Sequence, residues 1–252
     1  MNSRKIIIGD VHGCLAELKE LLNKINLNQS DQLFFIGDLI DKGPDSLGVV
    51  RFVYELSIKQ SVTLIIGNHE DKFLRYLHNR EKNLKALQAM KITADFELLA
   101  ENLTLEEITF LKNSYFNYTL KQESVLLLHG GITGDCSLDF SINHQFSKHP
   151  KKEFKGLELL TRTRHIDVNG KFVSLGDETS ESKFWAEVYG GQFGKVIFGH
   201  NSFLNENPKV FPHAVGVDTG CVYGGWLTAV ILNDNKEQSI SVKAHDKYAE
   251  IR

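Results

Sequence analysis

The chain has 252 residues, of which 42% are hydrophobic and 24% are charged, so its composition is that of a folded globular protein and excludes a disordered one. The formal net charge of −3 at pH 7 argues against a general nucleic-acid-binding protein, because such proteins usually carry a surplus of basic residues. The three cysteines, Cys14, Cys136 and Cys221, are widely spaced, which favours reduced thiols and a cytoplasmic location. We expect no signal peptide before Arg4 and no membrane-spanning segment.

The first part of the chain predicts alternating strands and helices. Short apolar runs indicate strands at 6–8, 31–36 and 62–66, and leucines at helical spacing indicate a helix at 15–25. A second helix is expected to begin near Pro44 and Asp45. Because the connections are short, the three strands should pair in parallel.

The remaining chain combines a helical segment with more strands. Residues 71–113 are rich in leucine and lysine and predict a helical, cap-like insertion. Strands are expected at 116–120, 125–128, 195–198, 214–217, 226–232 and 239–244. The basic run at 149–155 is interpreted as a solvated loop. No repeat or low-complexity linker interrupts the chain, so we expect a single domain spanning residues 1–252.

Six polar side chains follow apolar runs, and each has a glycine close by. They are Asp10, His12, Asp38, Asn68, His129 and His200. Carboxylate oxygens and imidazole nitrogens suit divalent Mn²⁺, Fe²⁺ or Zn²⁺, and the lack of cysteine among them disfavours a structural zinc site. Six ligands exceed the need of one ion, so the pattern favours two ions about 3.5–4 Å apart that share a carboxylate. One such motif alone is commonly a turn, but five in order are hard to explain as turns.

The segments GDVHG, GDLIDKG, GNHE, HGG and GHN, in this order, resemble the phosphoprotein-phosphatase branch of the calcineurin-like metallophosphoesterases. The resemblance implies an α/β (α+β) fold of two packed mixed sheets flanked by helices, in four αββα layers. It also implies that Asp38 bridges two metal ions. The ligands of the first ion would be Asp10, His12 and Asp38, and those of the second would be Asp38, Asn68, His129 and His200.

The same resemblance implies two catalytic residues. His69 matches the general acid for the leaving oxygen, and Asp41 matches the carboxylate that orients it. An imidazolium beside a carboxylate can donate a proton near neutral pH, so these roles are chemically reasonable. The alternatives are a helix-capping or packing role for His69 and a turn role for Asp41.

Two features indicate which branch of the family the chain resembles. Protein phosphatases of the family usually have arginine where this chain has Lys42, and lysine cannot make the bidentate contact with phosphate that arginine makes. The block GVDTGCVYGGWLTA at 216–229 is similar to the diadenosine-tetraphosphatase-like members. Within it, Asp218, Gly220 and Gly224 are interpreted as turn residues, and Tyr223 as a side chain that could face the metals.

The segment TRTRH at 161–165 supplies two further phosphate-binding candidates. If it is extended, Arg162 and Arg164 point to the same side and could clamp a phosphate chain, with Arg164 as the first choice. His165 is interpreted as a neighbour of the site and not as a metal ligand. Aromatic side chains could stack a nucleobase, but a core position is favoured for Trp185, Tyr189 and Trp226.

We therefore expect a cytoplasmic phosphohydrolase that uses two divalent metal ions, with Mn²⁺ as the first choice, and a metal-bridging hydroxide. The expected substrate is a nucleoside polyphosphate, such as a dinucleoside tetraphosphate, or a nucleotide-capped RNA end. One alternative is a protein serine/threonine phosphatase, and another is an inactive binding scaffold of the same fold. The complete ligand set and His69 disfavour the scaffold. The sequence leaves the oligomeric state open and does not decide between Arg162 and Arg164.

Overall fold

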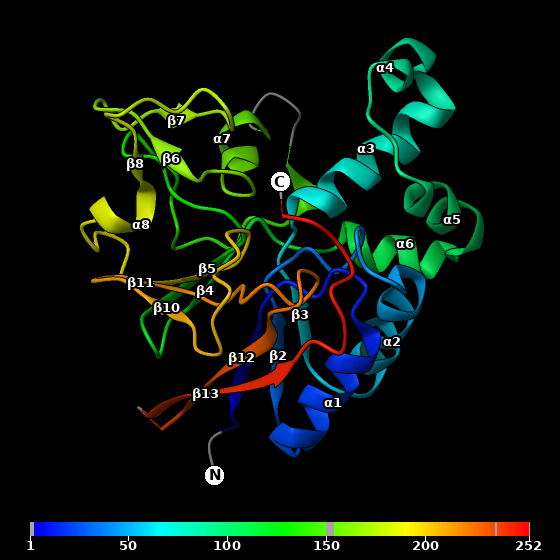
Figure 1. Cartoon of the computed structure of the whole chain (residues 1–252), viewed down its shortest axis with the longest axis horizontal. Coiled ribbons are helices and arrows are strands. Elements are labelled where there is room, and N and C mark those ends of the chain that lie inside the picture. The colour runs from blue at the N-terminus through cyan, green and yellow to red at the C-terminus, as the bar shows by residue number, and fades with distance from the viewer. Residues whose placement is uncertain (1–2, 150–153, 235, 252) are drawn as a thin grey trace.

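The computed structural model describes residues 3–149, 154–234 and 236–251 (Figure 1). Residues 150–153 of the basic run lie outside these ranges, so its interpretation as a solvated loop stays a prediction. Among the described residues, no helix is long and apolar enough to cross a membrane, and the three cysteines are free thiols.

The first sheet has a parallel centre and an antiparallel edge. Its strands, in spatial order, are β13 (Lys236–Lys243), β12 (Trp226–Asn233), β1 (Lys5–Ile8), β2 (Gln32–Phe35) and β3 (Val62–Leu64). β1, β2 and β3 pair in parallel, as the short strand–helix–strand connections predict. β12 pairs antiparallel with both β1 and β13. The predicted antiparallel pair near the end of the chain is therefore confirmed.

The second sheet repeats this plan with antiparallel strands at both edges. Its strands, in spatial order, are β10 (Lys209–Val210), β11 (Ala214–Gly216), β9 (Lys195–Phe198), β5 (Val125–Leu128) and β4 (Asn117–Leu120). β5, β9 and β11 are parallel, and β4 and β10 pair antiparallel to their neighbours. A small third sheet consists of β7 (Phe172–Val173), β6 (His165–Ile166) and β8 (Lys183–Phe184).

The two large sheets pack face to face because their strands are apolar on both sides. In β1, Ile7 contributes to the core between the sheets, whereas Ile6 and Ile8 contribute to the core under the helices. Successive side chains of a strand point to opposite faces, so a fully apolar strand can serve two cores. Residues of both sheets fill the inter-sheet core, among them Phe34, Ile36, Leu127, Ile197, Val215 and Val230.

Helices cover the outer faces of the sheets. α1 (Leu15–Ile25) and α2 (Ser46–Lys59) pack beside the first sheet (Figure 1). Asp45 caps α2 by accepting a hydrogen bond from the Gly48 N–H, which confirms the predicted helix start. On the other side lie the small sheet, α7 (Phe154–Leu159), α8 (Trp185–Val188) and a 3₁₀ turn at Phe146–Lys148. The expected architecture of two mixed sheets flanked by helices is confirmed.

The segment that follows β3 and precedes β4 in the sequence is helical, as predicted. Its first helix begins at Asn68, slightly before the predicted start at residue 71. Its helices are α3 (Asn68–Lys82), α4 (Leu84–Gln88), α5 (Ala94–Asn102) and α6 (Leu105–Lys112). α3, α4 and α5 extend away from the sheets at the upper right of Figure 1. Because α3 starts at Asn68, the GNHE motif forms the first turn of a helix and not a loop.

We predict that Leu127→Ala lowers the free energy of unfolding by about 2–5 kcal/mol, because it opens a cavity between the two sheets. Leu127 is fully buried in the inter-sheet core. The measurement is urea denaturation. The control is Leu105→Ala at a 79% exposed position, which should change stability by less than about 0.5 kcal/mol. Equal losses in the two variants would contradict the two-sheet packing.

Candidate active site

The carboxyl ends of the parallel strands from both sheets meet at one place. Asp10 and His12 follow β1, Asp38 follows β2, and Asn68 follows β3 after a short connection. From the second sheet, His129 follows β5, and His200 follows β9 by two residues. Contacts join the two groups across the sheets. The His200 N–H lies 3.1 Å from both carboxylate oxygens of Asp10, and His129 Nε2 lies 3.2 Å from Asn68 Oδ1.

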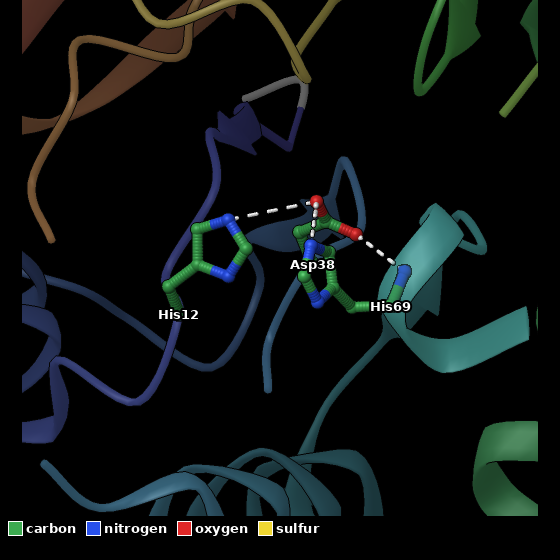
Figure 2. Close-up of side chains that lie close together, drawn as sticks. All are labelled: His12, Asp38 and His69. Atoms are coloured by element: carbon green, nitrogen blue, oxygen red, sulfur yellow. Dashed lines mark hydrogen bonds and ion pairs between the residues drawn. The ribbon is translucent and has the colours of Figure 1, made fainter. Parts of the chain in front are cut away.

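Asp38 lies at the centre of this cluster. Its Oδ2 is 3.5 Å from His12 Nε2 and 3.3 Å from His129 Nε2, and its side chain is only 2% exposed. Its Oδ1 accepts a hydrogen bond from the backbone N–H of His69, the second residue of α3. Figure 2 shows the Asp38 carboxylate between His12 and His69. A buried carboxylate surrounded by imidazoles is the arrangement expected of a bridging metal ligand.

Among the described residues, three groups of donor atoms are close enough to hold a metal ion, and two of these groups lie at this cluster, apart from the third at Cys14, Glu17 and Cys221. One of the two sets at the cluster consists of His12, Asp38 and His69, and the other of Asp38, His129 and His200. Within each set the donor atoms lie within 4.8 Å of one another, and Asp38 belongs to both. Asp10 and Asn68, two of the predicted ligands, belong to neither set, so the predicted assignment of ligands stays a prediction. The presence of His69 in the first set was not expected, because the sequence analysis treated it only as a proton donor.

Hydrogen bonds to backbone carbonyls orient two of the imidazoles so that their Nε2 atoms face Asp38. His12 Nδ1 lies 2.9 Å from the carbonyl oxygen of Ile40, and His129 Nδ1 lies 2.7 Å from that of Ile36. A carbonyl oxygen can only accept, so each Nδ1 donates a proton to it, which fixes the orientation of the ring. Backbone carbonyls commonly orient metal-binding histidines in this way. Burial lowers the pKa of His12 and of His200 well below the usual value, which favours the neutral, ligating form.

Buried negative charge at the centre also fits a cation. Burial and the nearby Asp218 raise the pKa of Asp10 well above its usual value. Burial alone would lower the pKa of His129, but the charges of Asp38 and Asp10 outweigh it and raise that pKa to about 9. The buried carboxylates therefore favour positive charge at the centre of the cluster.

Two further observations show that the residues fit divalent metal ions. His200 Nε2 is buried and has no hydrogen-bond partner within the described ranges, although such atoms are usually paired. The ammonium group of Lys42 lies 2.8 Å from His12 Nε2, so positive charge is already accommodated beside one proposed ligand atom. The donor set of carboxylate, imidazole and amide groups suits Mn²⁺, Fe²⁺ or Zn²⁺.

Unusual backbone conformations are concentrated at the site. Eight non-glycine residues have positive φ angles within the described part of the chain. Five of these belong to the site, namely His12, Asp38, Asp41, Lys42 and His200. Such conformations are costly for residues with a side chain and persist only where the surrounding structure enforces them. Tight turns after the strands therefore direct these side chains toward the site.

Two glycines are needed for close approach to the central carboxylates. A Cβ atom at Gly67 would lie 2.1 Å from Asp38 Oδ1, and one at Gly199 would lie 2.1 Å from Asp10 Oδ1. Both distances are far shorter than any non-bonded contact. The glycine before Asn68 and the glycine before His200 therefore make room for the carboxylates of Asp38 and Asp10.

Glu70 holds the turn that carries Asp38. Its buried carboxylate accepts hydrogen bonds from the backbone N–H groups of Asp38, Leu39 and Ile40, at 2.8–3.3 Å, and from that of Gly67 at 3.0 Å. One side chain thus connects the end of β2 to the beginning of α3. The last residue of the GNHE motif is therefore a structural link within the site.

His69 and Asp41 form a buried pair beside the centre. His69 Nδ1 lies 2.8 Å from Asp41 Oδ2, and His69 Nε2 points toward Asp38 at 3.9 Å. Burial alone would raise the pKa of Asp41, but the hydrogen bond and charge of His69 lower it to about 2. The backbone N–H of Asp41 donates to Asp95 of α5 at 2.9 Å. The helical segment thus contacts the turn that holds this pair.

A cavity of about 330 Å³ opens beside these residues, and its size is within the range of small-molecule sites. Its lining residues are Asp38, Lys42, Asn68, His69, Arg164, Phe184, His200, Asn201, Ser202, Phe203, Tyr223 and Ile251. Arg164 Nη2 lies 3.5 Å from His200 Nδ1, and Lys42 Nζ lies 5.4 Å from the centre of the Tyr223 ring. Two cations and a phenol therefore face the same space as the predicted metal ligands.

The structure separates the two arginines of the TRTRH segment. The segment is not extended at its start, because the N–H groups of Arg162 and Thr163 donate to the Leu159 carbonyl as a turn. Arg162 forms ion pairs with Asp71 and Glu158, and it is not among the described residues that line the cavity. An extended segment was the condition for both arginines to point to the same side, and this condition is not met at Arg162.

The aromatic residues also occupy different positions from those considered in the sequence. Trp185 is 1% exposed and Tyr189 is 7% exposed, so the favoured core interpretation is confirmed for both. The rings that line the cavity are instead Phe184, Phe203 and Tyr223. Asp218 accepts the Gly220 N–H and thus shapes a turn, as expected. Sequence reasoning missed Asp95, Phe184 and Phe203, because neither a motif nor a strand end marks them.

The arrangement defines the class of protein. Two metal-binding sets that share one aspartate, at the carboxyl ends of two packed mixed sheets, describe a dinuclear metallophosphoesterase. The sequence of residues 3–204 matches the calcineurin-like phosphoesterase family. The chain belongs to this family, whose members use a dinuclear divalent-metal centre to hydrolyse phosphoester or phosphoric anhydride bonds.

Relatives with established names are similar over nearly the whole chain. The chain is 32% identical to bis(5'-nucleosyl)-tetraphosphatase PrpE of Oceanobacillus iheyensis, over 93% of this chain and 91% of the relative. It is 30% identical to the protein of the same name from Halalkalibacterium halodurans, over 89% of this chain and 88% of the relative. Both relatives are thus similar in length to the protein described above.

Solved structures support the same family. A crystal structure of a protein called a diadenosine tetraphosphatase superposes with a TM-score of 0.72 at 27% identity, covering 97% of this chain and 95% of that one. A protein serine/threonine phosphatase from Saccharomyces cerevisiae superposes with a TM-score of 0.65 at 16% identity, covering 97% of this chain and 81% of that one. The second likeness concerns the fold alone.

We predict that Glu70→Gln lowers the free energy of unfolding by about 1–3 kcal/mol, because an amide nitrogen would face backbone N–H groups and leave them unpaired. Urea denaturation measures this loss. The control is Glu81→Gln, since Glu81 is exposed on the same helix. If both variants unfold at the same urea concentration, Glu70 does not hold the turn.

Proposed function

We propose that the protein is a phosphohydrolase that acts on nucleoside polyphosphates, with a dinucleoside tetraphosphate or a nucleotide-capped RNA end as its substrate. The observation that supports this most directly is the shared Asp38, which lies beside a cavity lined by Lys42 and Arg164. A polyphosphate chain needs several positive charges, and the cavity supplies two cationic side chains besides the metal-binding groups.

The names of the relatives support the choice of nucleotide over phosphoprotein. The curated relatives described above are called bis(5'-nucleosyl)-tetraphosphatases, and they cover about nine-tenths of this chain at 30–32% identity. Lys42 agrees with this choice, because protein phosphatases of the family usually have arginine there. The dinucleoside polyphosphate is therefore our first candidate substrate.

We propose two divalent metal ions, with Mn²⁺ as the first choice and Fe²⁺ or Zn²⁺ as alternatives. Asp10, His12 and Asp38 would hold one ion. The ligands proposed for the other are Asp38, Asn68, His129 and His200. When bound, the two ions supply positive charge for the phosphoryl oxygens and make a water molecule nucleophilic near neutral pH. His12 and His129 would bind through Nε2, because the Nδ1 of each ring donates its proton to a backbone carbonyl.

The other site residues would neutralise charge and move a proton. We propose that His69 donates a proton from Nε2 to the leaving oxygen, while Asp41 accepts a hydrogen bond from Nδ1 and keeps the ring in place. Lys42 and Arg164 would contact phosphate oxygens, and Tyr223 would orient Lys42. We assign no phosphate contact to Arg162, because its guanidinium is already paired with two carboxylates.

The organisation of the chain is proposed to be a single domain over residues 1–252, with residues 71–113 as a helical insertion. The contact between Asp95 and the backbone of Asp41 supports a role for this insertion in holding the catalytic turn. We also propose a cytoplasmic location, which the free thiols of Cys14, Cys136 and Cys221 support.

We predict that Asp38→Asn reduces bound metal from about two ions per chain to well below one, because the amide cannot bridge two cations as a carboxylate does. Elemental analysis of protein purified with Mn²⁺ gives the stoichiometry. Asp135→Asn, at an exposed loop position, should keep the full metal content. Retention of two ions by the Asp38 variant would exclude it as the bridging ligand.

The proposed activity is tested by turnover of two substrates in the presence of Mn²⁺. We expect kcat/KM for diadenosine tetraphosphate to exceed that for a phosphothreonine peptide by at least about tenfold, since each tenfold step corresponds to only about 1.4 kcal/mol of transition-state binding. Asp38→Asn serves as the blank. A preference for the peptide would identify a protein serine/threonine phosphatase. Turnover of neither substrate above the blank would favour an inactive scaffold or a different phosphoester.

A further inference from the structure

One wall of the cavity is aromatic. Phe184 and Phe203 both line the cavity and are only half-buried, so part of each ring is open to solvent. Their ring centroids are 6.0 Å apart and their planes are inclined at 84°. Two nearly perpendicular rings form a corner, in which a planar ligand ring can lie against one face and meet the edge of the other ring.

This aromatic corner is attached directly to the phosphate-binding side of the cavity. Phe203 follows the predicted metal ligand His200 by three residues. Phe184 pairs with His165 between β8 and β6, and the next residue, Trp185, donates its N–H to the Arg164 carbonyl at 3.0 Å. Phe203 therefore shares a segment with His200, and Phe184 lies on the strand next to the segment that carries Arg164.

Both rings are held in place by packing that does not depend on a ligand. Phe211 packs against both rings, with centroid distances of 5.4 Å to Phe184 and 5.9 Å to Phe203. The Phe203 ring also lies against Gly216, where a Cβ atom would come within 2.6 Å of ring atom Cε2. A ring that is already fixed loses little conformational entropy when a ligand stacks on it.

We propose that Phe184 and Phe203 form a nucleobase-binding wall, which stacks one base of the substrate while its phosphates face Lys42 and Arg164. This inference rests on the proposed function, because it assumes a nucleotide in the cavity. A purine offers a flat apolar face beside a charged phosphate chain, which matches an aromatic wall beside two cations. Stacking on aromatic side chains tolerates different bases, so adenine and guanine nucleotides should bind with similar affinity.

The test is equilibrium binding to the Mn²⁺-loaded protein by isothermal titration calorimetry. The two ligands are adenosine 5′-(β,γ-methylene)triphosphate, which carries a base, and methylenediphosphonate, which does not. Phe184→Leu and Phe203→Leu should each weaken nucleotide binding by about 5- to 150-fold, the effect of losing one base–aromatic stack. Binding of methylenediphosphonate should change by less than about twofold, because neither ring is assigned a phosphate contact.

Two control variants separate stacking from structural damage. Phe211→Leu removes a ring that packs against both Phe184 and Phe203, but Phe211 is not among the described cavity-lining residues, so nucleotide binding should weaken less than in either of the other leucine variants, and binding of methylenediphosphonate should not change. Phe203→Tyr keeps the aromatic face and should retain nucleotide affinity. Equal weakening of both ligands in Phe203→Leu, or unchanged nucleotide binding in both leucine variants, would overturn the proposal.

Failure of this inference can be told apart from failure of the proposed function. If diadenosine tetraphosphate is cleaved but the leucine variants bind the nucleotide normally, the activity holds and the base-binding wall is wrong. If the tetraphosphate is not cleaved but the leucine variants selectively lose nucleotide affinity, the wall holds and the proposed reaction is wrong.

Discussion

The buried carboxylate of Asp38 imposes the strongest physical constraint on this structure. An unpaired charge at this depth would be very costly, so positive or hydrogen-bonding partners must surround it. These partners come from the ends of strands in both sheets, and the parallel strand order brings them together. The tight turns with positive φ and the contacts from Glu70 keep the carboxylate in position. Because the two sheets pack together, segments that are far apart in the sequence contact the same Asp38 carboxylate.

Much of this centre could be predicted from the sequence because its determinants are local. Asp10, Asp38 and His129 come within three residues of the ends of apolar strands, and the parallel pairing of such strands follows from the lengths of their connections. The positive φ angles could not be predicted from the sequence, because no local residue pattern distinguishes Asp38 in a strained turn from an aspartate in an ordinary turn. Their existence depends on the packing of the complete fold.

The cavity wall was less predictable because it depends on tertiary contacts. Arg162 and Arg164 have the same chemistry and similar sequence surroundings, and only the turn at Leu159 and the carboxylates of Asp71 and Glu158 separate them. Phe184 and Trp185 are neighbours in sequence, yet one lines the cavity and the other is buried. The strands in this region are short and their apolar pattern is weak, so the sequence does not reveal which of two adjacent residues faces the cavity. The predicted metal ligands thus follow regular strands, whereas the other side chains that line the cavity come mostly from irregular segments.

The position of Ile251 has a practical consequence for work with the purified protein. Ile251 lines the cavity, and Figure 1 shows that the C-terminal end of the chain lies close to the beginning of α3. β1 begins at Lys5, at the end of the strand opposite to Asp10 and His12. A histidine affinity tag fused after the last residue would place six additional imidazoles next to a cluster that binds cations. An amino-terminal tag avoids this competition, so it is the appropriate choice for every metal and ligand titration.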